Sequence, residues 1–500
     1  MPNTFSKVFH QAVYETGLRA EMSYPHDTPH PAAPFSKPRF ETYEEADRYL
    51  AGFVNHERLL HTVRRTDDLF GLTRIHRLLE RMENPQLGLK GIHLAGTKGK
   101  GSTAIFAEAI LRAQGVKTGL FTSPHLVDKE ERIQVAGRAI GKKEFLEWMN
   151  RLRPALAELA DSPQPPTFFD ILTTMMFLHF RKQAVEAVVL EVGLGGRLDS
   201  TNVFQADACV ITTLGLDHTE QLGHTLASIA AEKAGIIKNT APVVSHPQEP
   251  EARLVLEEKC LTMGAPLAWV GEQVRIEPDT TGRSAPFSVR TPRACYAGLT
   301  LSALGGHQRV NAAAAIAVVE TFLEKVQGRL PDPEKVRKAL FRTCPPGRIE
   351  LLAQEPLLVV DGAHNPLAME SLLATLKEEF RFEKLHVVFA CARDKDIRGM
   401  LSLLTRTADR WTLTAFDFPR IEHPAAIEAW LTKINPGANI CVAADPEAAL
   451  ENAYARSGPR DCILCCGSFY LAGEILKRMN VRFASGQRLQ ARWPRGEEEI

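Results

Sequence analysis

The densest group of residues able to do chemistry is Gly96-Thr97-Lys98-Gly99-Lys100-Gly101-Ser102-Thr103. It follows a short apolar run, residues 92–95, and precedes a helix expected over residues 104–114. Glycines let backbone N–H groups close around phosphate oxygens, a helix N-terminus adds a favourable dipole, and Lys100 neutralises charge. The hydroxyl of Ser102 can ligate the magnesium ion that accompanies a nucleotide. The stretch therefore predicts a loop that binds a polyphosphate.

The spacing of this loop differs from the usual phosphate-loop pattern G-x-x-x-x-G-K-[ST]. Leu94 stands where the first glycine would be, and Gly101 separates Lys100 from Ser102. A glycine-rich turn with an exposed lysine is the alternative interpretation, so the choice depends on the rest of the chain.

A carboxylate ends the next apolar run that reads as a buried strand, residues 185–192. Glu191 lies at the carboxyl end of this run, on the edge where open parallel sheets bind ligands. A buried carboxylate is costly unless it meets a cation. We therefore expect Glu191 to anchor magnesium. The alternative is an ion pair with Arg197.

Asp217 and His218 follow a further strand-like run, residues 208–214, and a lone histidine there is more often structural than a ligand. The helix after it places Lys233 on an apolar stripe with Leu226 and Ile229. Burial would lower the pKa of Lys233 and keep some free amine, which can react with CO2 to give a carbamate, an oxygen ligand for a metal. A snorkelling lysine is the alternative, and the pattern alone shows only an unusual position.

In the second half of the chain, polar residues again follow a strand-like run, in the stretch Asp361-Gly362-Ala363-His364-Asn365-Pro366. Asn365 and Pro366 explain the start of a helix by themselves, because one caps it and the other suits its first position. Asp361 and His364 are not needed for that purpose, so we expect them to face a cleft between domains.

Two further side chains are candidates for nucleotide contacts. Arg348 follows a predicted hinge, Pro345-Pro346-Gly347, from which it can reach a nucleotide between domains. Asn311 lies in the first turn of a helix expected over residues 308–325. It can bond a base or a phosphate, or it can simply cap the helix.

Strand-length apolar runs alternate with helical patterns in both halves, which predicts an α/β fold. The second alternation, after the hinge, is Rossmann-like but lacks a GxGxxG fingerprint. Residues 41–82 read as helical, and segment 266–304 as short antiparallel strands. A helix from Lys143 should end or kink at Pro154, and Thr167 with Asp170 should cap the next one.

The domain organisation follows from these patterns. We expect a flexible, proline-rich leader over residues 1–40, a first domain over 41–345, a second and smaller domain over 346–483, and a disordered tail over 484–500. Five hundred residues are more than one domain usually holds.

The composition excludes several function classes. Lys plus Arg and Asp plus Glu both number 60, so nothing indicates a nucleic-acid or polybasic membrane surface. No apolar run is long enough to span a bilayer, and the first residues lack the apolar h-region expected of a secretory signal. The nine cysteines are scattered, and the Cys462/Cys465 pair lies in an apolar strand without a zinc set, which favours reduced thiols in a cytoplasm.

Seven motifs together resemble the folylpolyglutamate synthase/dihydrofolate synthase family, within the Mur-ligase superfamily of ATP-dependent amide-forming enzymes. They occur in the family's order and cover roughly residues 41–480. The motifs are Gly96–Ser102, Phe121-Thr122-Ser123-Pro124-His125-Leu126, Glu191–Asp199, Gly215–Thr219, Glu232–Ile236, Pro346-Gly347-Arg348 and Asp361–Pro366.

The resemblance implies an N-terminal P-loop ATPase (Mur-ligase-like) domain followed by a smaller Rossmann-like α/β domain, with the reaction in the cleft between them. It implies that the loop binds ATP through Gly96, Thr97, Lys98, Gly99, Lys100, Gly101 and Ser102, together with Asn311, Arg348 and Asp361. Ser102 and Glu191 would bind one Mg²⁺, and His218, Glu191 and a carbamylated Lys233 would organise a second. His364 would lie near the transferred phosphate or the incoming glutamate, and Ser123, Pro124 and His125 would bind the pterin substrate. Lys98 replaces the asparagine that is common in bacterial members, although lysine is also a family variant.

The chemistry that the resemblance implies is transfer of the γ-phosphoryl group of ATP to the substrate's carboxylate, followed by attack of L-glutamate's amine on the acyl phosphate. Whether the acceptor is dihydropteroate, a reduced folate or both stays open. A Mur-type ligase acting on a UDP-linked substrate and a nucleotide-binding regulator without catalysis are the alternatives. Family members are usually monomeric, and we expect a monomer here.

Overall fold

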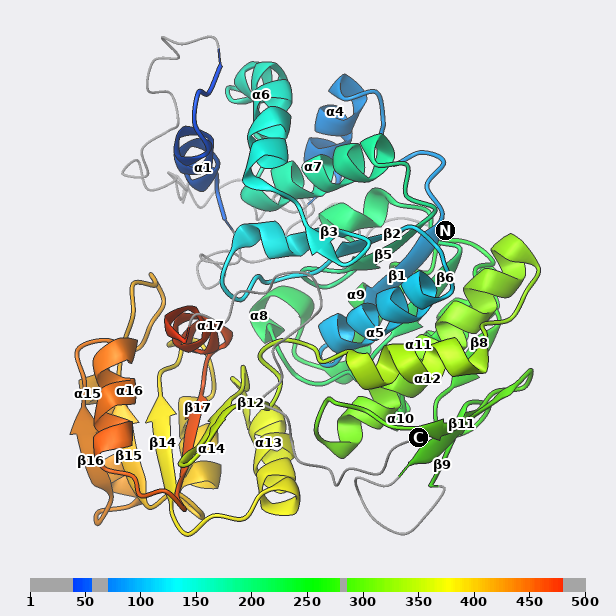
Figure 1. Ribbon diagram of the computed structural model, residues 1–500. Helices are drawn as coiled ribbons and strands as arrows, with labels where there is room; N and C mark the ends of the chain where they lie inside the picture. Colours follow the sequence, from blue (N-terminus) through cyan, green and yellow to red (C-terminus); the bar gives the residue numbers. More distant parts are fainter. Residues whose placement is uncertain (1–38, 56–70, 279–285, 480–500) are drawn as a thin grey trace, which may run out of the picture.

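The computed structural model describes residues 39–55, 71–278 and 286–479, and within them it builds two α/β units, each around its own sheet (Figure 1). The predicted α/β class is confirmed. The predicted leader and tail lie almost wholly outside the described residues. No helix within the described ranges is long and apolar enough to cross a membrane.

An eight-stranded sheet organises the N-terminal unit, in the order β4-β3-β2-β5-β1-β6-β7-β8. Its strands pair in parallel except at β3 and β4. The central strands are buried along their whole length, as near-continuous apolar runs require when helices cover both faces. The strands are β1 Gly91–Ala95, β2 Thr118–Phe121, β3 Ile133–Val135, β4 Arg138–Ala139, β5 Ala187–Glu191, β6 Ala208–Ile211, β7 Val243–Ser245 and β8 Leu267–Trp269.

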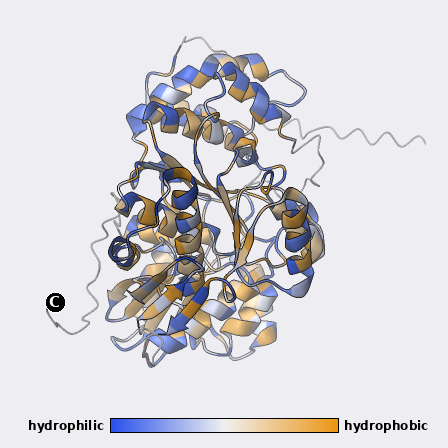
Figure 2. Cartoon of the chain, turned by 90° about the vertical axis from the view of Figure 1, so that its right-hand side faces the viewer, coloured by the Kyte–Doolittle hydropathy of each residue, from blue (hydrophilic) through white to orange (hydrophobic). Residues whose placement is uncertain are grey.

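Two apolar clusters cover the two faces of this sheet. The helices of one cluster are α1 Tyr43–Ala51, α4 Thr73–Arg81, α6 Lys142–Leu159, α7 Phe168–Lys182, α9 Leu226–Ala234 and α10 Pro250–Met263. The other contains α5 Lys100–Ala113, α11 Gly306–Gln327, α12 Pro333–Arg342 and an antiparallel sheet of β9 Arg275–Pro278, β10 Phe287–Arg290 and β11 Cys295–Leu299. Figure 2 shows mainly hydrophobic strands in the middle of the molecule and hydrophilic residues on the surrounding helices.

A six-stranded sheet organises the C-terminal unit, in the order β12-β13-β17-β14-β15-β16, parallel except at β12. Helices α13 to α15 pack on one face and α16 and α17 on the other. The elements are β12 Glu350–Gln354, β13 Leu357–Val360, α13 Pro366–Glu379, β14 Leu385–Phe389, α14 Ile397–Leu404, β15 Arg410–Leu413, α15 Pro424–Ile434, β16 Asn439–Val442, α16 Pro446–Ala455, β17 Cys462–Cys466 and α17 Phe469–Arg478.

The prediction that Pro154 ends a helix is wrong, because α6 is one helix that continues through Pro154 to Leu159, whereas a kink at Pro154 stays a prediction. The apolar stripe of α6 goes on beyond the proline, where Leu156 and Leu159 are buried. Their burial outweighs the one backbone hydrogen bond that proline cannot donate. The capping of α7 by Thr167 and Asp170 is confirmed: Thr167 Oγ1 accepts from Asp170 N at 3.2 Å, and Asp170 Oδ2 accepts from Thr167 N at 2.9 Å.

Three further elements differ from the prediction in where they begin, how they are divided or how they pair. The helix expected from residue 104 starts four residues earlier, at Lys100, inside the glycine-rich stretch. The helical region 41–82 resolves into α1 and α4, with residues 56–70 between them outside the described part of the chain. Segment 266–304 is antiparallel only in β9 to β11, because β8 pairs in parallel with β7.

Candidate active site

The glycine-rich stretch forms the connection between β1 and α5, with Gly99 as the N-cap residue of α5 at φ +88°. The N–H groups of Thr97 and Lys98 both donate to the carbonyl of Thr213, at 3.0 Å each. They are therefore unavailable to a ligand. The N–H groups of the first turn of α5 have no partner inside the helix, and they carry its positive dipole end. The loop thus offers an anion site at the start of α5.

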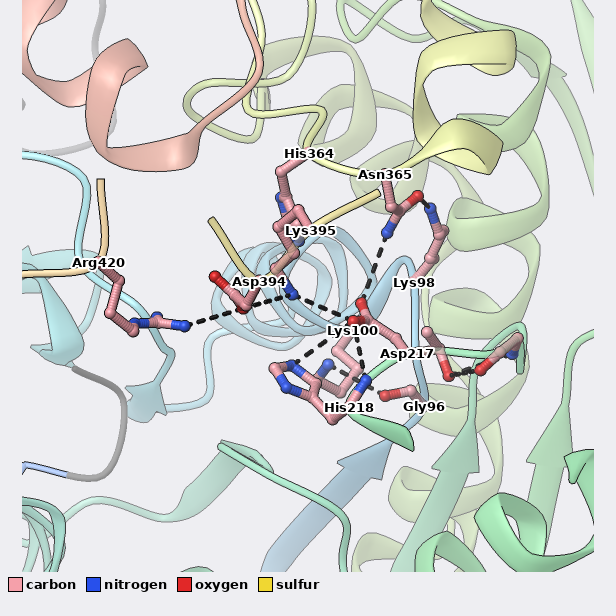
Figure 3. Close-up of polar contacts among 12 residues, drawn as sticks. Gly96, Lys98, Lys100, Asp217, His218, His364, Asn365, Asp394, Lys395 and Arg420 are labelled. Atoms are coloured by element: carbon pink, nitrogen blue, oxygen red, sulfur yellow. Dashed lines mark hydrogen bonds and ion pairs between the residues drawn. The ribbon is translucent and has the colours of Figure 1, made fainter. Parts of the chain in front are cut away.

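Lys100 lies in that first turn, and its Nζ donates to the carbonyl of Gly96 at 3.0 Å (Figure 3). A neutral carbonyl is a weak partner for an ammonium group compared with a phosphate oxygen. The lysine is therefore positioned beside the anion site, and it can exchange this contact for one with a phosphate.

Asn311 is buried in the second turn of α11 and contacts the loop. Its Oδ1 accepts from Thr103 Oγ1 at 3.4 Å, and its Nδ2 donates to Gln308 Oε1 at 2.8 Å. A Cβ atom on Gly99 would overlap with Asn311 Oδ1. The N-cap of α11 is Gly305, so the interpretation of Asn311 as a simple cap is wrong. Asn311 instead packs against the bend of the phosphate loop.

Glu191 ends β5 and pairs in register with Leu94 of β1, which brings it beside the loop. It is buried, and it accepts from the N–H of Ser123 at 3.0 Å. A Cβ atom on Gly101 would lie 3.4 Å from Glu191 Oε2. Burial raises the pKa of Glu191, and the nearby charge of Lys100 opposes that shift. Arg197 pairs with Glu232 at 2.9 Å, so the alternative ion pair between Arg197 and Glu191 is wrong.

His218 and Lys233 lie close enough for the charge of Lys233 to act on the imidazole of His218. His218 has φ +51° and is the N-cap of α8, Thr219–Leu222. Burial lowers the pKa of His218 to about 3, helped by the charges of Lys395 and Lys233. Lys233 is buried on α9. Within the described ranges, no three His, Cys, Asp or Glu side chains are grouped so that they could hold a metal ion. The two-metal arrangement stays a prediction.

The C-terminal unit contributes a second group of polar residues at the carboxyl end of β13. Asp361 is buried and accepts from the N–H groups of Ile349 at 2.8 Å and Ala363 at 2.7 Å. Burial raises the pKa of Asp361, and Arg348 opposes the shift. The guanidinium of Arg348 lies over the ring of Phe469, 4.7 Å from its centre.

His364 follows on the same segment and is neutral. Burial lowers its pKa to about 4. Its Nδ1 lies 2.8 Å from the carbonyl of Gly362. A carbonyl only accepts, so Nδ1 carries the proton and Nε2 keeps its lone pair. His364 can therefore accept a proton at Nε2.

Side chains of the two units meet directly at this point (Figure 3). Lys98 Nζ donates to Asn365 Oδ1, Asn365 Nδ2 donates to Asp217 Oδ2 at 3.5 Å, and Lys395 Nζ donates to Asp217 Oδ1 at 3.1 Å. Sequence reasoning missed Lys395. A signal was present, because four charged residues, 393–396, follow the carboxyl end of the buried strand β14.

The loop predicted to bind the pterin substrate lies beside Glu191 and reaches the C-terminal unit. Ser123 N–H contacts Glu191, and His125 Nδ1 accepts from Arg132 Nε at 2.9 Å. Arg132 is buried, with its guanidinium 5.6 Å from the ring centre of Phe168. Leu126 packs into an apolar cluster of the C-terminal unit. Binding of the pterin by Ser123, Pro124 and His125 stays a prediction.

Comparisons with known proteins agree with this two-part architecture. Residues 94–319 match the Mur ligase middle domain, and residues 347–469 match the Mur ligase glutamate ligase domain. The dihydrofolate synthase/folylpolyglutamate synthase of Bacillus subtilis is 34% identical over 412 residues, 82% of this chain and 95% of that protein. The chain belongs to the folylpolyglutamate synthase/dihydrofolate synthase family.

Other members support the same assignment. The dihydrofolate synthase/folylpolyglutamate synthase of Escherichia coli is 30% identical over 439 residues, 88% of this chain and 97% of that protein. Among solved structures, Mycobacterium tuberculosis folylpolyglutamate synthase complexed with ADP matches with a TM-score of 0.77 and 31% identity, covering 85% of this chain and 97% of that one. E. coli FolC in complex with DHPP and ADP matches with a TM-score of 0.75 and 27% identity, covering 87% and 97%. The predicted family is confirmed, and so is its fold of a P-loop domain followed by a Rossmann-like domain.

Proposed function

We propose that this chain is an ATP-dependent ligase that joins the amine of L-glutamate to the carboxylate of a reduced folate, of dihydropteroate, or of both. The observation that carries the proposal is the meeting of the phosphate loop with the polar end of β13. There Lys98 of one unit contacts Asn365 of the other, and Asp361 and His364 lie on the same segment as Asn365. Arg348 precedes β12, and its segment is held beside this one by the hydrogen bond from Gly362 N–H to the carbonyl of Gly347. Membership of the family supplies the reaction class.

The residues beside the loop fit one magnesium ion. Ser102 and Glu191 offer a hydroxyl and a carboxylate oxygen, the ligand types that Mg²⁺ prefers. Glu191 is buried and has no ion pair within 4.0 Å in the described chain, so a cation would repay part of its desolvation. Magnesium bound there would neutralise charge on the phosphoryl oxygens. A second ion held by His218, Glu191 and a carbamate on Lys233 is part of the proposal.

In the first step, Lys100 and the N–H groups at the start of α5 bind the phosphates of ATP, while Asn311, Arg348 and Asp361 hold the nucleotide. The acceptor's carboxylate attacks the γ-phosphorus. The bond to the β-phosphate oxygen breaks, and the products are ADP and an acyl phosphate.

In the second step, the amine of glutamate attacks the acyl carbon and inorganic phosphate leaves. The attacking nitrogen must lose a proton, and Nε2 of neutral His364 can accept it. Contact between the two units shields the acyl phosphate from water, which would otherwise hydrolyse it.

The substrates are then small molecules: ATP, L-glutamate and a folate or dihydropteroate. We expect a monomer that works in the cytoplasm, and the balanced charge gives no reason to expect a nucleic-acid partner.

Mass analysis of the products tests the proposal. The purified protein is incubated with Mg-ATP and L-glutamate together with either dihydropteroate or tetrahydrofolate, and matched reactions omit ATP or glutamate. We expect a mass increase corresponding to added glutamate with at least one acceptor, and only in the complete reaction. If neither acceptor gains glutamate, the folate assignment is wrong. Amide formation on a UDP-linked acid would then favour the Mur-type alternative, and nucleotide binding without turnover would favour the regulator.

A further inference from the structure

Lys98 joins the phosphate loop to the C-terminal unit. Its backbone N–H is fixed in the N-terminal unit by the carbonyl of Thr213 at 3.0 Å, and its side chain crosses to Asn365 Oδ1. The same oxygen caps α13 by accepting from the N–H of Ala368 at 3.0 Å. One side-chain atom therefore links the position of the loop to the first turn of α13.

The contact belongs to a network whose members alternate between the units (Figure 3). Lys98 and Asp217 come from the N-terminal unit, and Asn365 and Lys395 come from the C-terminal unit. The side chains of Asp217 and Lys395 are only 14% and 13% exposed. Polar contacts shielded from water in this way are stronger than surface contacts. The network is thus able to hold the two units in one relative position.

The ammonium group of Lys98 has no formal counter-charge in direct contact. Its partner is a neutral amide, and no carboxylate of the described chain lies within 4.0 Å of Nζ. Burial lowers the pKa of Lys98 to about 8; the carboxylates of Asp217 and Asp361 oppose this shift without touching the ammonium group, and the charges of Arg348 and Lys395 add to it. A desolvated ammonium is stabilised by an anion. The anion site at the start of α5, two residues further along the chain, is where a nucleotide phosphate would supply one.

We propose that Lys98 is a positioning residue that couples nucleotide binding to the docking of the two units. A phosphate in the loop stabilises its ammonium group, and that group holds Asn365 at the start of α13. Asp361 and His364 lie just before Asn365 in the chain, and the segment of Arg348 is joined to them by the hydrogen bond from Gly362 N–H to the carbonyl of Gly347 at 3.0 Å. The contact therefore also sets the place of the C-terminal half of the site. The inference rests on the proposed function in one respect, namely that the anion is a nucleotide phosphate.

Hydrogen–deuterium exchange of the full-length protein, with and without saturating Mg-ADP, tests this inference at the N–H groups of α13's first turn. Lys98→Met keeps the aliphatic stem and removes the ammonium group. Lys98→Arg restores a charged donor. Lys143→Met removes the same charge from an exposed position on α6 and serves as the matched control. ADP affinity is measured for each variant by calorimetry.

In the wild type and in Lys143→Met, we expect ADP to slow exchange at the start of α13 at least several-fold. In Lys98→Met we expect ADP still to bind, with affinity reduced no more than about tenfold, but the slowing to be lost. Lys98→Arg should recover it. In the ligase reaction, Lys98→Met should also release more phosphate per amide formed, since looser docking admits water to the acyl phosphate.

A second variant keeps the test decisive if Lys98→Met fails to fold. Asn365→Ser retains an N-cap oxygen but is too short to hold the lysine, so it should lose the ADP-dependent slowing in the same way. Undiminished slowing of exchange in Lys98→Met or in Asn365→Ser at saturating ADP would overturn the inference and leave the proposed function intact. Failure of the wild type to bind ADP at all would contradict the proposed function itself.

Discussion

A single methyl group added at Gly99 should break the fit between the phosphate loop and α11. Gly99 has φ +88°, and a Cβ atom there would overlap with Asn311 Oδ1 and lie 3.5 Å from His246 Cε1. Both neighbours are buried, so neither can turn into solvent. Gly99→Ala therefore combines backbone strain with a steric conflict.

The two contributions can be separated, because Gly115, just after α5, has φ +86° and no atom within 4 Å of the position its Cβ would take. The left-handed conformation costs about 1–2 kcal/mol for a residue with a Cβ, and this cost is common to both glycines. Only at Gly99 must Asn311 move, which sacrifices its hydrogen bonds with Gln308 and Thr103, at about 1 kcal/mol each. Gly99→Ala should thus lower the free energy of unfolding by about 2 kcal/mol more than Gly115→Ala.

Urea unfolding and ADP calorimetry on both variants measure the difference. We expect Gly115→Ala to bind ADP like the wild type. Gly99→Ala should bind ADP at least about tenfold more weakly, because the first-turn N–H groups of α5 are displaced by the same strain. Equal stability and equal ADP affinity of the two variants would show that the contact between Asn311 and the loop does not shape the anion site.

Two further predictions test the charge arrangement of the site. Lys100→Met should weaken ADP binding by about 10- to 150-fold, because it removes one charge-assisted hydrogen bond of about 1.5–3 kcal/mol. The control Lys117→Met, at an exposed position, should leave the affinity unchanged. Equal affinities of the two variants by calorimetry would contradict the role of Lys100. Burial lowers the pKa of His246 to about 3 in the folded protein, whereas its pKa in the unfolded chain is about 6.5. The contribution of neutral His246 to stability is therefore fully present above about pH 6.5 and is lost as the pH falls from there toward 3. Between about pH 6 and pH 4, which lie inside that window, the free energy of unfolding should decrease with falling pH in both proteins. The decrease should be smaller in His246→Gln than in the wild type, by about 1.4 kcal/mol per pH unit, as measured by urea unfolding. Parallel pH profiles of the two proteins would show that His246 is not held neutral.

The parts of the site that follow a buried strand could be predicted from the sequence. Glu191 and Asp361 each end an apolar run or come directly after one, and parallel strands bring such ends to one edge of a sheet. The position of Lys233 on an apolar stripe likewise predicts the burial that the structure shows. These predictions succeed because strand ends and helix faces are local properties of the chain.

Contacts between distant segments could not be predicted in this way. Lys395 and Asp217 lie 178 residues apart, and their contact depends on how two separately folded units dock. The predicted helix end at Pro154 is wrong for a related reason: proline removes one backbone hydrogen bond, but the burial of Leu156 and Leu159 beyond it comes from tertiary packing. Local patterns give the elements, and the packing between them decides which local preference is overridden.

The segment after β6 contacts both the phosphate loop and the C-terminal unit. The carbonyl of Thr213 fixes the N–H groups of Thr97 and Lys98, and Gly215 exchanges two hydrogen bonds of 3.2 Å with Thr97 Oγ1. Two residues further on, Asp217 accepts from Lys395 and Asn365 of the other unit. A connection of five residues, 213–217, therefore runs from the phosphate loop to the C-terminal unit. If Lys98 couples the two units as proposed, a movement of the loop would reach the C-terminal unit by two routes, through the side chain of Lys98 and through this segment.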